Sequence, residues 1–162
     1  MNFLPATLEG DTLTLPFGPT QLPEELASRL ESAGKCDVIA GIRPEHFEDA
    51  TVADEHQLGG MRFTITIDVV ESMGSEHYAY FDVEAQAHAS DDLAELAEDA
   101  GLNELPGDGA THVVARLSSE SRADAGHPVE LVLDLSQIKL FDPDGGRNLT
   151  TRRTKTPAGA SR

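Results

Sequence analysis

The sequence holds a single cysteine, Cys36, and no tryptophan among its 162 residues. One cysteine cannot form an internal disulfide, which is typical of proteins in a reducing compartment. The apolar neighbours Val38 and Ile39 favour a buried thiol over a nucleophile. A chain of this length buries roughly 68–70% of its unfolded surface, so we expect one domain held by its own core.

Long apolar runs are also absent. The longest are a few residues, against the roughly 20 that a membrane-spanning helix requires. The N-terminal residues lack the basic region followed by an apolar stretch that marks a signal peptide. We therefore expect a soluble chain with no targeting segment of its own.

Positive charge is scarce in most of the chain. The sequence has 12 Lys and Arg against 29 Asp and Glu. Four of the basic residues lie beyond residue 150 and all the acids before it, so residues 1–150 carry a net charge near −21. Such a body repels nucleic acid and anionic membranes over about 8 Å at physiological salt. The acidity indicates either solubility or electrostatic steering of a basic partner.

A phosphate-binding loop is missing as well. Such a loop needs spaced glycines followed by Lys and then Ser or Thr. Here Gly59-Gly60 precedes Met61, and Gly145-Gly146 precedes Arg147. We therefore expect no ATP hydrolysis by these residues, and no nucleotide or Mg²⁺ cofactor bound to them.

Histidines and acids are present but lack the spacing of a site. The most suggestive groups are Asp54-Glu55-His56 and Glu76-His77, and neither has the arrangement of zinc ligands. With 29 acids, a pair suited to glycoside hydrolysis arises by chance. We expect no catalytic residue and no metal site.

Alternating apolar and polar residues predict several β-strands. The clearest is residues 63–69 (FTITIDV), where β-branched residues alternate with polar ones. Residues 77–83 place Ala79, Phe81 and Val83 on one face and Tyr78 and Tyr80 on the other. The other expected strands are residues 3–8, 12–15, 37–43, 112–117, 129–135 and 137–141.

Two short helices and a tail complete the expected organisation. The first helix starts near Pro23, with Leu26 and Leu30 one turn apart. The second runs from Ser90 as N-cap to a stop at Gly101. Residues 142–146 predict a turn before a short terminal strand, and residues 151–162 predict a disordered basic tail.

Four segments, in order, resemble one known domain. They are residues 1–5 (MNFLP), 38–46 (VIAGIRPEH), 69–76 (VVESMGSE) and 140–146 (LFDPDGG). Together they are similar to the C-terminal regulatory, transport-associated OB domain of MalK-like ATP-binding subunits in carbohydrate-importing ABC transporters of the maltose, trehalose and glycerol-phosphate group. The insert near residues 87–109 looks like that of actinobacterial trehalose-type members.

The resemblance implies a mainly β fold, an OB-type barrel with extra strands and two short helices over residues 1–150. It implies a fragment of a longer subunit whose preceding ATPase domain binds ATP and Mg²⁺. The domain would tether a homodimer at the cytoplasmic face of the plasma membrane. It would be joined to membrane permease subunits through the ATPase domain and would offer a docking surface to a regulatory protein, with no nucleic-acid partner. The alternative is an OB-type module that senses a sugar, sugar phosphate or oxyanion.

Nine residues are candidates for an interface or regulatory surface. Arg43 and Glu45 flank Pro44, which ends a strand, so they form either a structural pair or part of a subunit interface. Gly74 suits a structural turn. Tyr78 and Tyr80 either fill an interface or form a stacking platform. The full set is Arg43, Glu45, His46, Glu71, Gly74, Tyr78, Tyr80, Phe141 and Asp142.

Overall fold

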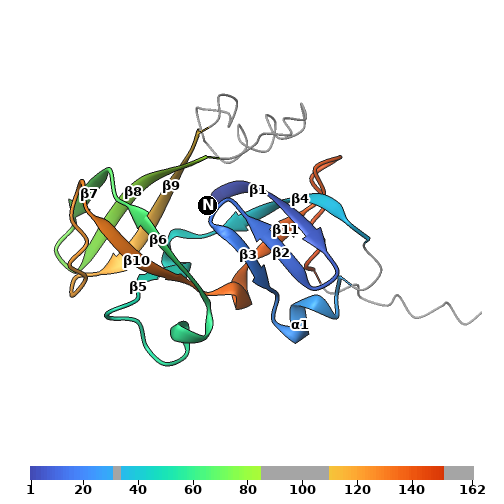
Figure 1. The fold of residues 1–162 in the computed structure, drawn as a ribbon, viewed down its shortest axis with the longest axis horizontal. Coiled ribbons are helices and arrows are strands. Elements are labelled where there is room, and N and C mark those ends of the chain that lie inside the picture. Colours follow the sequence, from blue (N-terminus) through green and yellow to red (C-terminus); the bar gives the residue numbers. More distant parts are fainter. Residues whose placement is uncertain (31–33, 85–109, 152–162) are drawn as a thin grey trace, which may run out of the picture.

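The computed structural model describes residues 1–30, 34–84 and 110–151. Their strands form two neighbouring lobes, one holding β1–β4, β11 and α1 and the other holding β5–β10 (Figure 1). The strands are β1 Asn2–Glu9, β2 Thr12–Leu15, β3 Gly18–Gln21, β4 Cys36–Ile42, β5 Phe47–Asp49, β6 Met61–Thr66, β7 Val69–Ser72, β8 Glu76–Glu84, β9 Ala110–Ser118, β10 Pro128–Leu133 and β11 Lys139–Phe141. The helix α1 covers Glu24–Ala27, and short 3-10 turns cover Pro44–His46, Gln57–Gly59 and Leu135–Gln137.

Three antiparallel sheets organise these strands. The first sheet has the order β11-β4-β1-β2-β3, the second β5-β10-β6 and the third β7-β8-β9. The expectation of a mainly β fold is confirmed. Among the described residues the hydrogen-bonded ladders form three sheets and do not close into one barrel.

One hydrophobic core joins the sheets because each strand turns its apolar face inward. In β1 the buried apolar residues are Leu4, Ala6 and Leu8, and in β8 they are Ala79, Phe81 and Val83. The tyrosines of β8 lie on the opposite face, as the alternation predicts. The sequence pattern therefore identified the buried face of these strands correctly.

A cluster of phenylalanines locks the lobes together. Phe17, in the turn between β2 and β3, stacks on Phe63 of β6 with ring centroids 4.3 Å apart. Phe47 and Phe81 approach Phe17 edge-on or tilted at 6.3 and 6.5 Å. Such aromatic pairs each add about 0.5–1.5 kcal/mol beyond the area they bury. At this cluster the contact between the first sheet and the other two is thus apolar.

The expected strand at residues 63–69 is divided. It breaks at Ile67 and Asp68 into β6, which pairs with β10, and β7, which pairs with β8. The N–H of Asp68 donates to the carbonyl of Tyr80 at 2.8 Å, although Val69 is the residue in register with Tyr80. Two residues facing one are a β-bulge, which bends a strand from one sheet into another.

Several other boundaries differ from the prediction. The expected strand at 129–135 ends at Leu133, because Asp134 caps a 3-10 turn through a hydrogen bond from the Ser136 N–H at 2.9 Å. The next strand begins only at Lys139. Strands β3 and β5 were not expected, and α1 is a single turn that Pro23 precedes as N-cap. The terminal strand is an isolated bridge between Phe141 and Asn148. The second expected helix and residues 152–162 of the expected tail lie outside the described residues.

Candidate interaction surface

The strand end at Arg43 carries an exposed ion pair. Arg43 is extended and precedes the 3-10 turn Pro44–His46. Its Nη1 lies 3.8 Å from Oε1 of Glu45, and the two side chains are 59% and 37% exposed. A pair this open to solvent contributes at most about 1 kcal/mol. A hydrogen bond from its own backbone lowers the pKa of Glu45, and the nearby His46, Arg116 and Arg43 charges lower it further.

His46 faces inward. Burial lowers the pKa of this histidine. Its Nδ1 has no hydrogen-bond partner among the described residues. Its carbonyl accepts the N–H of Asp134 at 2.9 Å, which fixes the start of the turn after β10. His46 therefore has a structural role here, because its partly buried side chain packs inward and its carbonyl fixes the backbone after β10.

The two tyrosines of β8 are held by carboxylates. The Tyr80 hydroxyl donates to Oε2 of Glu71 at 2.7 Å, and this hydrogen bond raises the pKa of Tyr80. The Tyr78 hydroxyl lies 3.5 Å from Oε2 of Glu76. Arg116 on β9 brings its Nη1 within 3.6 Å of the other oxygen of Glu76. The outer face of the third sheet is thus an ordered polar surface.

Gly74 makes the tip of the β7–β8 hairpin. Its φ of +86° is readily adopted only by glycine, as expected for a turn residue. Beside it Met73 is 66% exposed, and Val69 at the start of β7 is 50% exposed. Both ends of β7 therefore place an apolar side chain in solvent.

Phe141 and Asp142 lie in the other lobe. Phe141 packs edge-on against Phe3 with centroids 5.9 Å apart. Both rings lie over Gly41, where a Cβ would meet the Phe141 ring at 2.8 Å. The carboxylate of Asp142 accepts the Asp144 N–H at 2.9 Å, and its carbonyl accepts the Gly146 N–H at 3.0 Å. These bonds form the expected turn at residues 142–146.

The nine candidates thus fall on separate surfaces. One group follows the outer face and tip of the third sheet, another the strand end after β4, and the last the outer face of the first sheet (Figure 1). Arg116 links the first two groups, since it lies near both Glu45 and Glu76. Sequence reasoning missed Arg116 because cross-strand pairing, not sequence spacing, brings it there.

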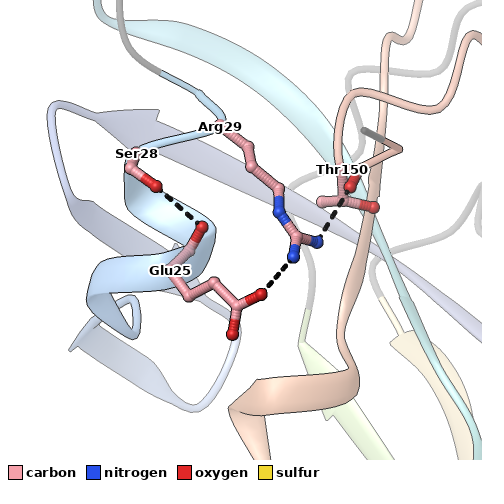
Figure 2. A network of polar contacts seen from close by, with 4 residues as sticks. All are labelled: Glu25, Ser28, Arg29 and Thr150. Carbon is pink, nitrogen blue, oxygen red and sulfur yellow. Dashed lines mark hydrogen bonds and ion pairs between the residues drawn. The ribbon is translucent and has the colours of Figure 1, made fainter. Parts of the chain in front are cut away.

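A further polar network ties α1 to the end of the described chain (Figure 2). Arg29 pairs with Glu25 one turn earlier and also donates to the carbonyl of Thr150 at 3.5 Å. The Ser28 hydroxyl donates to the Glu25 carbonyl at 2.9 Å. Thr150 is 3% exposed, so its contact with Arg29 holds the last described residues of the chain against the segment after α1.

The described residues contain no group of three or more His, Cys, Asp or Glu side chains placed to hold a metal ion. None of the helices in the described part is long and apolar enough to cross a membrane.

Comparison with known proteins shows which proteins this chain resembles. Residues 1–47 match the MalK OB fold domain. The trehalose import ATP-binding protein SugC of Mycobacterium tuberculosis is 40% identical over 155 residues, covering 93% of this chain and 38% of SugC. The sn-glycerol-3-phosphate import protein UgpC of Chromohalobacter salexigens is 29% identical over 99% of this chain and 35% of its own length. The trehalose/maltose import protein MalK of Thermococcus litoralis is 29% identical over 91% of this chain and 34% of its own length.

Among solved structures, the cytoplasmic molybdate-binding protein ModG superposes with a TM-score of 0.48 and 15% identity, covering 86% of this chain and 94% of that one. The chain spans less than two fifths of the sequence relatives it matches. Over most of its length the chain is similar to the ATP-binding subunits of sugar importers, and its residues 1–47 match a MalK OB fold domain.

Proposed function

We propose that these residues form the regulatory and dimerisation domain of a sugar importer's ATP-binding subunit. The carrying observation is the 40% identity to SugC over 93% of this chain, together with the missing phosphate-binding loop in the sequence. ATP and Mg²⁺ would bind a separate ATPase domain, and this part would hold two subunits together. The complex would sit at the cytoplasmic face of the membrane through its permease subunits.

The outer face of the first sheet suits a symmetric contact. Because Leu4 and its alternate neighbours point into the core, Phe3 points to the other side of β1. There Phe3, Ile39 and Phe141 form an apolar group across β1, β4 and β11. A two-fold interface brings the same patch from each copy together, so an apolar centre avoids like-charge repulsion, although Asp37 and Lys139 lie on the same face. Because the rest of the chain is strongly acidic, we expect two copies to associate through this apolar face rather than through a charged one.

The test is self-association of the purified chain. Sedimentation equilibrium is expected to show a concentration-dependent dimer, and Phe3→Glu is expected to shift it to monomer because two carboxylates would meet at the two-fold contact. The matched control is Met73→Glu, which adds the same charge at the far lobe and is expected to leave the dimer unchanged. A chain that stays monomeric at every concentration, or that loses the dimer equally in both variants, contradicts the tether.

Two further measurements separate the alternatives. Incubation with ATP and Mg²⁺ is expected to release no phosphate above the buffer blank, and turnover by the purified chain would contradict a non-catalytic role. Titration calorimetry with trehalose, a sugar phosphate and molybdate is expected to show no binding heat. Saturable heat with one of them would favour the sensing module instead.

A further inference from the structure

The backbone of β7 has one edge that faces away from its sheet. The N–H of Met73 donates to the carbonyl of Glu76 at 2.8 Å. Hydrogen-bonded pairs alternate along an antiparallel ladder. With Glu71 opposite Tyr78, that pair is therefore also bonded, and the N–H and C=O groups of Val70 and Ser72 point away from β8.

The opposite edge of the third sheet is closed by side chains. The Asn2 amide donates to the Val114 carbonyl at 2.9 Å and accepts the Val114 N–H at 2.9 Å. The Glu48 carboxylate accepts the Ser118 N–H at 3.0 Å. These two side chains occupy the outward groups of Val114 and the N–H of Ser118, so a further strand cannot pair with these residues of β9 without displacing them.

The β7 edge has no such cover. Among the residues that the structure describes, the outward backbone groups of Val70 and Ser72 accept and donate no hydrogen bond. On the outer face of the strand, Val69 and Met73 are exposed on either side of Glu71. An unpaired edge with ordered side chains is a template for a partner strand.

We propose that the β7 edge binds an extended segment of another protein as a fourth strand of the third sheet. The residue of that segment opposite Glu71 would be Lys or Arg, and the residues two positions to either side would be apolar, facing Val69 and Met73. Two further acids border β7 and add to the preference for a basic segment. They are Asp68, directly before the strand, and Glu76 at the start of β8, which Arg116 also approaches.

A second copy of this chain fits the edge poorly. The two-fold register that satisfies the outward groups of Val70 and Ser72 sets Glu71 directly against Glu71 of the other copy, and like charges opposite each other are destabilising. The inference rests on the regulatory role in the proposed function and names the chemistry of its partner. It is separate from the tether, which uses the first sheet.

The test uses the ¹⁵N-labelled chain and a blocked seven-residue peptide with valine, lysine and valine at alternate positions and threonine between them. Binding is expected to move the amide signals of Val70 and Ser72 and to slow their hydrogen exchange. The control peptide has glutamate in place of lysine and is expected to bind about fivefold more weakly, because a like-charge pair replaces an attractive one. Equal affinity for both peptides, or shifts confined to other strands, would overturn the proposal.

Two variants locate the bond-forming groups. Ser72→Pro removes an outward N–H at an exposed position and leaves the β7–β8 ladder intact, so it is expected to weaken peptide binding about tenfold, whereas Ser72→Thr keeps the N–H and the affinity. Glu71→Lys is expected to reverse the preference toward the glutamate peptide. If Ser72→Pro folds and binds the peptide as the wild type does, the proposal is wrong. If Ser72→Pro does not fold, the proposal is wrong when Glu71→Lys still prefers the lysine peptide over the glutamate peptide. Dimerisation of each variant is measured as well. A variant that loses peptide binding but still dimerises shows that the β7 edge is affected and the proposed dimer contact of the first sheet is not.

Discussion

Replacing Asp49 by Asn is expected to destabilise the fold in a pH-dependent way. Asp49 ends β5 and is 2% exposed. Its Oδ1 accepts the N–H and hydroxyl of Thr51 at 2.9 and 2.7 Å, and its Oδ2 accepts the buried Ser121 hydroxyl at 2.7 Å. The carboxylate thus joins β5 to the turn that follows β9. Asparagine has one carbonyl oxygen in place of two and turns an N–H₂ group toward a hydroxyl.

The magnitude follows from these contacts. A hydrogen bond to a charged group contributes about 1.5–3 kcal/mol, and a buried group left without its partner costs a similar amount. Losing one carboxylate oxygen and the charge predicts a loss of about 2–3 kcal/mol in the free energy of unfolding. For a chain of this size the midpoint of thermal unfolding then falls by roughly 4–12 °C. Glu55→Gln, an equal charge change at an exposed position in the same loop, is expected to be nearly neutral.

The pH dependence gives the sharper check. Burial by itself raises the pKa of Asp49, but the hydrogen bonds from Thr51, Ser121 and the Arg122 backbone outweigh it and leave the pKa below its ordinary value. A depressed folded-state pKa adds stability that is present above the unfolded pKa of about 3.9 and is lost as pH falls through the folded pKa. Urea unfolding of wild type and Asp49→Asn should therefore differ at neutral pH and converge below about pH 4. Equal stability at neutral pH, or a difference that persists in acid, refutes the reasoning.

Three other outcomes follow from the geometry. Asn2→Ala is expected to lower the free energy of unfolding by about 1–3 kcal/mol, because the outward groups of β9 lose both hydrogen bonds, and unchanged chemical denaturation would contradict this. Gly60→Ala places a Cβ 2.1 Å from a backbone oxygen of β10 and is expected to prevent stable folding, whereas Gly59→Ala meets nothing within 4 Å and should melt like the wild type. In alkaline absorbance titration Tyr80 is expected to ionise above the ordinary tyrosine pKa, because its hydroxyl donates to the Glu71 carboxylate. Glu71→Gln is expected to lower the pKa of Tyr80 toward the ordinary value. If the titration is the same in both proteins, the hydrogen bond is absent in solution.

The sequence predicted the recurring part of the fold. Alternation identified the strands that became β1, β2, β4, β8 and β9 within one or two residues at each end, because a half-buried strand needs a period of two. The same rule placed Tyr78 and Tyr80 on the outer face. The order of four short motifs also predicted the relationship to the sugar-importer subunits, which the comparisons support.

The candidate surface was less accessible to sequence reasoning. Gly74 was correctly placed in a turn, which depends on neighbours in the chain. Arg43 lies 3.8 Å from Glu45, and whether the two serve as a structural pair or in an interface stays a prediction. The hydrogen bond between Tyr80 and Glu71 depends on the register of the β7–β8 hairpin, and the identity of the two residues does not predict that register. The prediction that the nine candidates serve an interface stays a prediction.

What the sequence by itself determined is therefore local: which residues alternate, which turn needs a glycine, and that the first 150 residues are acidic and lack a phosphate-binding loop. The tertiary structure decided every pairing between distant residues. It divided one apolar run at Asp68 between two sheets, brought Asn2 to the edge of β9 and buried Asp49 against Ser121. The physical reason is that hydrogen bonds and burial between distant segments are satisfied only once the strands have chosen their partners.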